Sequence, residues 1–170
     1  MILEIKGERV IIRKTTERDL GDLQKLWNDG RVMKWVGFPD GLGYDRETFE
    51  AWLAEVEANP ARHHFVIVAP EMGFCGETYY AVDSGHQRAS LDIKLIPEAQ
   101  GKGLATDALR TLIRHVFAVE DGVNSVWTQP SRENRAARRL YRRCGLRPAP
   151  RPSEITNGES FWALSREYAR

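Results

Sequence analysis

The sequence predicts a mixed α/β fold, with a mostly antiparallel central sheet and helices on both faces, from three observations. Strand-like runs between residues 64 and 96 are separated only by short turns, which predicts an antiparallel meander. A strand, a glycine-containing turn and an amphipathic helix follow one another between residues 89 and 117. Beyond that helix, strand and helix patterns alternate. We expect one domain over residues 1–170, because no internal repeat and no flexible linker interrupts the chain.

The first third of the chain predicts a strand and two helices. Residues 9–13 have the β-branched pattern of a strand. Thr16 is a helix cap, with Asp19 three residues later as the acid of a capping box. Residues 28–43 read as a loop rich in glycine and bulky apolar residues, and a second helix is expected to start near Asp45.

The remaining elements follow from apolar periodicity and from turn residues. A run of six residues at 147–152 contains three prolines, so it is unsuited to a central strand or a helix. A tight hairpin turn is expected at residues 156–159. The expected strands are 64–68, 74–81, 89–96, 123–128 and 161–165, and the expected helices are 105–117 and 133–143.

Composition excludes several classes of protein. The chain has 170 residues, 42% hydrophobic and 29% charged, and a formal net charge of +1, which argues against a nucleic-acid partner. No apolar run is long enough to span a membrane, and the N-terminus does not resemble a signal peptide. With only Cys75 and Cys144, we expect a reduced, cytoplasmic protein in which both thiols are small buried groups rather than nucleophiles. No set of residues has metal-ligand spacing, so no metal is expected.

The turn before the helix at 105–117 has the features of an anion site. The N-terminus of a helix offers unpaired N–H groups and the positive end of its dipole. Gly101 and Gly103 would let a phosphate approach the backbone. A P-loop needs four residues between its glycines, and here Lys102 is followed by a glycine; a dinucleotide fingerprint needs a third glycine where Thr106 stands.

Two motifs resemble those of the GCN5-related N-acetyltransferases. Gln100, Gly103 and Ala105 match the Gln-x-x-Gly-x-Ala form of their pyrophosphate-binding motif. One strand later, residues 133–146 resemble the Asn-x-x-Ala-x-x-Leu-Tyr-x-x-x-Gly-Phe signature, with Leu146 in place of the phenylalanine. The opening Gly-Glu-Arg-Val-Ile-Ile-Arg is similar to the branch that includes ribosomal-protein N-terminal acetyltransferases. The resemblance covers roughly residues 7–147 and the expected final hairpin.

The resemblance implies acetyl-CoA as co-substrate, no metal, and a sheet that splays between the strands near 91–96 and 123–128. The backbone of the first of these strands would hold the acetyl group and the pantetheine arm. The N–H groups of the glycine turn would hold the pyrophosphate, and an asparagine would contact the pantetheine. The cofactor-binding residues so implied are Leu95, Ile96, Pro97, Gln100, Gly101, Lys102, Gly103, Leu104, Ala105, Thr106 and Asn134.

Transfer to an amine requires orientation, a neutral amine and a proton for the departing thiolate. By resemblance, Tyr141 is the general acid; by its position on an apolar helix face it is a core aromatic. Glu77 is expected to accept the amine proton through water, the alternative being an exposed strand carboxylate, and Asp92 is a second candidate. No single base is needed if the amine is already neutral. Trp35 and Phe38 are the expected acceptor-binding residues.

The expected function is therefore direct transfer of an acetyl group to a primary amine in a ternary complex. The acceptor is open between a protein N-terminus and a small polyamine or aminoglycoside, and a non-catalytic CoA-binding sensor module is the rival. The arginines at 132–151 are read as a solvated helix face, of which one could reach a cofactor phosphate. We expect no membrane partner, and a homodimer is one alternative for the assembly.

Overall fold

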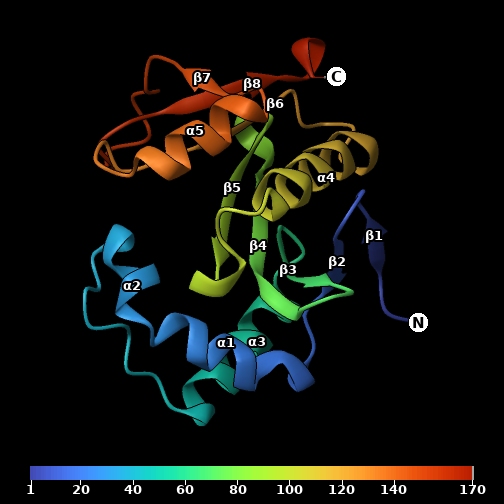
Figure 1. Ribbon diagram of the computed structural model, residues 1–170. Coiled ribbons are helices and arrows are strands. Elements are labelled where there is room, and N and C mark those ends of the chain that lie inside the picture. The colour runs from blue at the N-terminus through green and yellow to red at the C-terminus, as the bar shows by residue number, and fades with distance from the viewer. Residues whose placement is uncertain (170) are drawn as a thin grey trace.

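An eight-stranded sheet runs through the computed structural model, which describes residues 1–169 (Figure 1). Its strand order is β1-β2-β3-β4-β5-β6-β8-β7, and every neighbouring pair is antiparallel except β5 and β6, which are parallel. The strands are β1 Glu4–Lys6, β2 Ile11–Lys14, β3 Arg62–Ala69, β4 Gly73–Asp83, β5 Arg88–Leu95, β6 Ser125–Thr128, β7 Arg147–Pro148 and β8 Trp162–Ser165.

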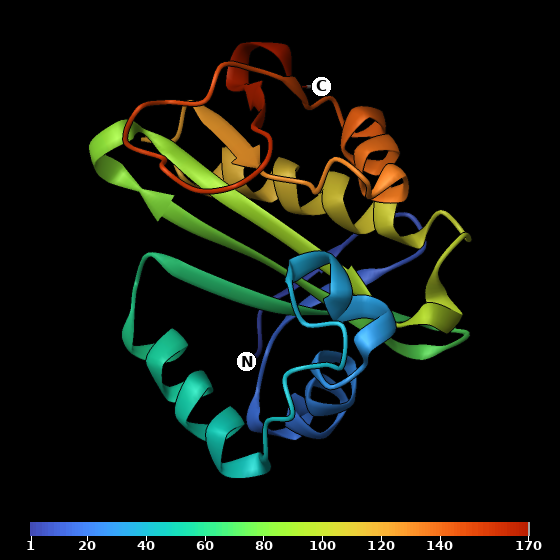
Figure 2. The same ribbon diagram turned by 90° about the vertical axis from the view of Figure 1, so that its left-hand side faces the viewer.

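Helices cover both faces of the sheet, as the sequence predicts (Figure 2). On one face lie α1 Leu20–Trp27, α2 Gly30–Met33 and α3 Arg46–Ala58, which share an apolar core with the sheet. On the other face lie α4 Leu104–Val119 and α5 Arg135–Arg143. The stripe of α4 that the 3.6-residue period predicts is buried there in a larger core. Burial of two apolar helix layers thus holds the sheet between them.

Side-chain caps set where α3 and α5 begin, and a capping box precedes α1. In the 3₁₀ turn Glu17–Asp19 that leads into α1, the Asp19 carboxylate accepts a hydrogen bond of 2.8 Å from the backbone N–H of Thr16. Asp45 accepts one of 2.9 Å from the N–H of Thr48 at the start of α3. Asn134 caps α5 in the same manner. The caps of α3 and α5 each satisfy an N–H group that the first helical turn leaves without a partner.

A β-bulge in β4 sets how this strand packs against β5. Ile67 of β3 pairs with Gly76 and the next residue pairs with Phe74, so Cys75 is an extra residue. Gly76 has a φ of 156°, and a Cβ there would lie 2.0 Å from the carbonyl oxygen of Lys94. Only glycine permits this approach of two strands, which brings Glu77 against β5.

The sheet splits between its two parallel strands. β5 and β6 are paired only from Arg88 and Ser125 to Ser90 and Trp127, whereas β5 continues to Leu95. The predicted splay between the strands near 91–96 and 123–128 is confirmed. The second half of β5 therefore keeps its partner on the β4 side and lacks one on the other side, within the part of the chain that the structure describes.

Two local predictions were wrong, and one strand was not predicted. The loop at 28–43 contains α2 and a following 3₁₀ turn, because Asp29 caps a helix there through the N–H of Arg31. The strand β1, whose three residues pair with β2, was not predicted. Residues 156–159 form no hairpin, since β8 pairs with β7 at residues 147–148 across a long connection. The carbonyl of Asn157 instead accepts a bond of 2.6 Å from the side chain of Gln129.

Candidate functional site

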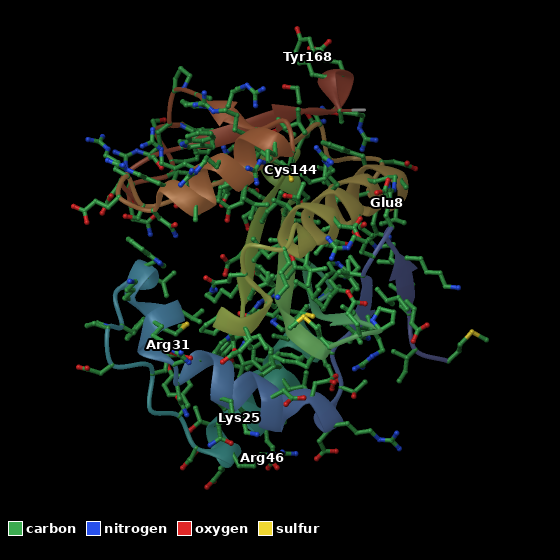
Figure 3. The ribbon with its side chains drawn as sticks, viewed as in Figure 1. Glu8, Lys25, Arg31, Arg46, Cys144 and Tyr168 are labelled. Carbon is green, nitrogen blue, oxygen red and sulfur yellow. The ribbon has the colours of Figure 1, made fainter. Side chains whose placement is uncertain are left out.

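The split in the sheet opens into a cavity of about 500 Å³. One side of it is formed by the splayed half of β5 and by the turn that leads into α4, and the opposite side by the β6–α5 connection and α5. Residues of α2 and the 3₁₀ turn after it also line the cavity, and Arg31 lies on α2 (Figure 3). Segments far apart in the sequence thus surround one space.

The turn before α4 provides the anion site that the sequence predicts. Gly101 and Gly103 have φ values of 74° and 79°, in the left-handed region that favours glycine. Gly103 is the N-cap residue of α4 and supplies no capping side chain. The N–H groups of the first turn of this 16-residue helix therefore lack side-chain acceptors at the cavity.

Two side chains hold this turn in shape. Gln100, predicted to bind the cofactor, lines the cavity and donates from Nε2 to the carbonyl oxygen of Leu95 over 3.1 Å. The guanidinium of Arg9 donates to the carbonyl oxygen of Lys102. Because carbonyl and N–H groups point in opposite directions across a trans peptide, this contact helps to set the direction of the N–H of Gly103.

On α5, Asn134 and Tyr141 both reach the cavity. The side-chain oxygen of Asn134 accepts from the N–H of Ala137 over 3.1 Å, so its amide NH₂ is not used by the cap. Tyr141 is 5% exposed, and burial together with the charge of Asp92 raises the pKa of its hydroxyl group, against the effect of the neighbouring Thr128. The phenol is therefore a proton donor at neutral pH, and the aromatic ring belongs to the core.

Asp92 and Lys94 line the cavity from β5. They lie two residues apart, so their side chains leave the same face of the strand. The ammonium group of Lys94 contacts the carboxylate of Asp92 and lies 3.6 Å from that of Glu77. Burial would lower the pKa of Lys94, but the two carboxylates outweigh it and the pKa is raised. Lys94 is therefore a cation that two carboxylates hold in place beside the cavity.

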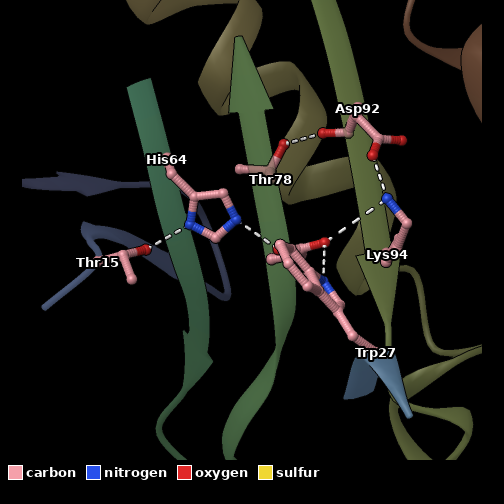
Figure 4. Close-up of polar contacts among 7 residues, drawn as sticks. Thr15, Trp27, His64, Thr78, Asp92 and Lys94 are labelled. Atoms are coloured by element: carbon pink, nitrogen blue, oxygen red, sulfur yellow. Dashed lines mark hydrogen bonds and ion pairs between the residues drawn. The ribbon is translucent and has the colours of Figure 1, made fainter. Parts of the chain in front are cut away.

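Glu77 is part of a buried polar chain that includes Lys94 and His64. Figure 4 shows Thr15, His64, Trp27 and Lys94 of this chain. The side chain of Glu77 is 4% exposed; it accepts from Trp27 Nε1 over 2.6 Å and contacts His64 Nε2. The other ring nitrogen of His64 lies 2.7 Å from the hydroxyl of Thr15. Burial would raise the pKa of Glu77, but His64 and Lys94 hold it below its usual value. The alternative of an exposed strand carboxylate was wrong, because α1 and β3 cover this position.

The structure brings most of the predicted site residues together. The predicted residues that line the cavity are Trp35, Leu95, Gln100, Gly101, Gly103, Leu104, Ala105, Thr106, Asn134 and Tyr141. Those not among its lining residues are Phe38, Glu77, Ile96, Pro97 and Lys102. Phe38 is 45% exposed, near the 3₁₀ turn that carries Trp35.

Sequence reasoning missed the lining residues that come from α2 and from the β6–α5 connection. Arg31, Val32 and Val36 fall in the segment read as a loop, where the Asp29 cap was the signal for a helix. Thr128 ends a correctly predicted strand, and residues 129–131 follow it. No sequence motif marks this segment. Arg139 and Arg143 of the basic run also reach the cavity.

Both cysteines are buried, as predicted. Cys144 lies where α5 packs against α4 (Figure 3), and burial raises the pKa of its thiol to about 11. Burial likewise raises the pKa of Cys75. Neither thiol has the low pKa of a nucleophilic cysteine.

Residues 1–169 contain no group of three or more His, Cys, Asp or Glu side chains that could hold a metal ion. In the same part of the chain, no helix combines the length and the apolar character needed to cross a membrane.

Comparison with known proteins agrees with this geometry. The sequence matches the family model of the acetyltransferase (GNAT) domain over residues 9–147. A search of curated proteins by sequence found no significant match. The fold is similar to that of spermidine N-acetyltransferase from Vibrio cholerae, solved with CoA and spermine, with a TM-score of 0.82, 20% identity, and coverage of 95% of this chain and 98% of that chain.

Two other solved structures share the fold. One is a ribosomal L7/L12 alpha-N-protein acetyltransferase in complex with coenzyme A, with a TM-score of 0.79, 14% identity, and coverage of 97% of this chain and 98% of that chain. The other is an aminoglycoside acetyltransferase in complex with coenzyme A, with a TM-score of 0.77, 21% identity, and coverage of 94% and 96%. At these identities the similarity concerns the fold.

The fold and the match over residues 9–147 define the class of protein. The chain belongs to the GNAT family of acetyltransferases, as the two motifs indicate.

Proposed function

We propose that this protein transfers the acetyl group of acetyl-CoA to a primary amine, by direct attack of the amine within a ternary complex. One observation carries the proposal. A single cavity contains the uncapped N-terminus of α4, the gap between β5 and β6, and the buried hydroxyl-bearing side chain of Tyr141. An anion-binding end and a proton-donating end are thereby joined by a channel with an unpaired strand edge.

The residues present fit coenzyme A. Its pyrophosphate suits the N–H groups of the turn at Gly101–Ala105, which no side chain caps. Its pantetheine amides suit the backbone groups of β5 beyond Ser90, which lack a strand partner on that side. Arg139 and Arg143 supply cations for the remaining phosphate on the α5 side.

Bound acetyl-CoA supplies an activated thioester, and the chain supplies orientation and proton transfer. As the amine nitrogen bonds to the acetyl carbon and the carbon–sulfur bond breaks, Tyr141 donates its proton to the sulfur. Asp92 receives the proton that the amine loses, directly or through water. Glu77, the base expected from the sequence, does not line the cavity. It contacts Lys94, and Lys94 contacts Asp92, which does line the cavity. We therefore assign Asp92 to the amine and Glu77 to the support behind it.

The charges of the lining favour an acceptor with one amine. Among the described residues that surround the cavity, Asp92 is the sole carboxylate, and it already contacts the ammonium group of Lys94. The cation Arg31 also lines the cavity and is paired with Asp29. A polyamine or an aminoglycoside carries several ammonium groups, which need several carboxylates. Trp35 and Val36 add apolar surface at the entrance. These features support a peptide or protein N-terminus as acceptor.

The test is release of free thiol from acetyl-CoA with a panel of amines. We expect turnover with short peptides that carry a free α-amine, and at most weak turnover with spermidine or kanamycin. The same peptides with a blocked N-terminus are the matched control and should release no thiol. Preferred turnover of the polyamine or aminoglycoside would overturn the peptide assignment. Tight binding of CoA without thiol release for any amine would identify a non-catalytic sensor module.

A further inference from the structure

Lys94 occupies an unusual position for a lysine. Its side chain is 13% exposed, although lysine is among the residues least often buried. It lies between the carboxylate of Asp92, which is 44% exposed toward the cavity, and that of Glu77, which is 4% exposed. The ammonium group thus links a buried carboxylate to Asp92, which faces the cavity and is the one carboxylate in its lining among residues 1–169 (Figure 4).

The buried side of this link is held from several elements. Glu77 of β4 contacts His64 of β3 and accepts from Trp27 of α1 over 2.6 Å. His64 in turn contacts Thr15, which follows β2, over 2.7 Å. A tautomer with the proton on Nε2 satisfies both contacts of the imidazole. Because β3, β4 and β5 are paired in register, these groups cannot move independently.

Stability alone does not account for the arrangement. Removing a lysine and a glutamate from water is costly, and an apolar pair of similar volume commonly serves a core equally well. The arrangement also ends at the cavity and not at the outer surface. The backbone carbonyl of Asp92 accepts from the hydroxyl of Thr78 over 2.9 Å, so the residue is held at its main chain as well as at its carboxylate.

We propose that Lys94 is a positioning residue for acetyl transfer. It holds the carboxylate of Asp92 in place beside the reacting amine, while the Thr15–His64–Glu77 chain holds Lys94. The inference rests on the proposed function, since it concerns the group that receives the amine proton. It predicts that Lys94 acts through Asp92 and has no separate effect on the binding of acetyl-CoA.

A double-mutant cycle tests this dependence. Lys94→Met should lower kcat by roughly 100-fold, because a small displacement of a catalytic group has effects of that size. The affinity for acetyl-CoA, measured by calorimetry, should not change. In a protein that already carries Asp92→Asn, adding Lys94→Met should slow turnover by less than about threefold. The same fold loss in both backgrounds, or an unchanged kcat in Lys94→Met, would overturn the proposal.

A matched control removes another mostly buried cation from the same strand. The side chain of Arg88 is 9% exposed and pairs with Asp83 and Glu154 at the opposite end of β5. Arg88→Met should leave kcat unchanged, even if its melting temperature falls. If Arg88→Met lowers kcat as much as Lys94→Met does, the loss reflects general damage to the strand and the proposal fails.

A second measurement does not depend on activity. In ¹H–¹⁵N spectra of lysine side chains, the protected ammonium group of Lys94 should give a signal at neutral pH. Asp92→Asn should shift that signal, and Asp83→Asn should not. An unchanged signal in Asp92→Asn would show that the contact is absent in solution. If the shift is seen but the native protein releases no thiol with any amine, the proposed function fails and the positioning role fails with it. If the native protein is active and only the cycle fails, the proposed function stands.

Discussion

One end of the cavity is made by a strand, a turn and a helix that follow one another in the chain, whereas the other end is lined by α2 and β5, with β3 and β4 supporting β5 from behind. At the first end, β5, Gly103 and α4 lie within one continuous segment. At the second, His64, Glu77 and Lys94 meet only because three strands are paired in one register. The first end depends on backbone groups and the second on side chains. Damage to the first end should therefore weaken the binding of CoA, whereas damage to the second should change kcat or the KM for the acceptor.

The largest effect is expected at the backbone end. In Gly103→Val, a β-branched side chain would have to adopt a φ of 79°, and its Cβ would lie 3.4 Å from Arg9 Nη1. Backbone strain together with lost hydrogen bonds to a phosphate should raise the Kd for CoA roughly 1000-fold. Gly122→Val is the control, since a Cβ there meets nothing within 4 Å. Calorimetry with CoA measures both; an unchanged Kd in Gly103→Val would remove the assignment of this turn to the pyrophosphate.

An intermediate effect is expected at Tyr141, the proposed proton donor. Tyr141→Phe removes the proton donor and keeps the aromatic ring in the core, so kcat should fall about 100-fold with little change in CoA affinity. Because the pKa of Tyr141 is raised, its phenol stays protonated above its usual range. The native kcat should therefore show no loss between about pH 7 and pH 9.5. Full activity in Tyr141→Phe would leave Tyr141 as a core residue alone.

The smallest effect is expected at the entrance. Trp35 and Phe38 are similarly exposed, at 39% and 45%, but only Trp35 lines the cavity. Trp35→Ala should raise the KM for the acceptor about tenfold through lost apolar contact, and Phe38→Ala by less than about threefold. Steady-state kinetics with the best acceptor of the panel distinguishes the two. Equal effects would place Phe38 against the acceptor as well, as the sequence predicts.

The residues proposed to bind acetyl-CoA could be predicted because their sequence signals are local. Gln100, Gly103 and Ala105 lie within a short stretch of the chain, so their spacing can be read directly from the sequence. Asn134 and Tyr141 are seven residues apart, at the cap and within the same helix, and therefore lie on one face. Such patterns survive in the sequence whatever surrounds them. The split between β5 and β6 was available only through the family resemblance, since strand pairing over long separations leaves no periodic trace.

The charged residues near the proposed acceptor site, Glu77 and Lys94, could not be predicted to the same degree. Glu77 was a reasonable candidate as a carboxylate beside Gly76, but its burial depends on Trp27 and His64, which are 50 and 13 residues away along the chain. Lys94 was overlooked because a lysine in a strand is usually read as solvent-facing. Its position follows from the β4–β5 register, in which it stands opposite Glu77.

By itself, the sequence determined the meander, the amphipathic helix α4, the glycine turn and the family, because periodicity, glycine and capping residues act over a few neighbouring positions. Only the tertiary structure decided which carboxylate faces the cavity. Register and burial place Asp92 at the open gap and Glu77 behind Lys94, and a carboxylate's role depends on whether water, a cation or a substrate is next to it.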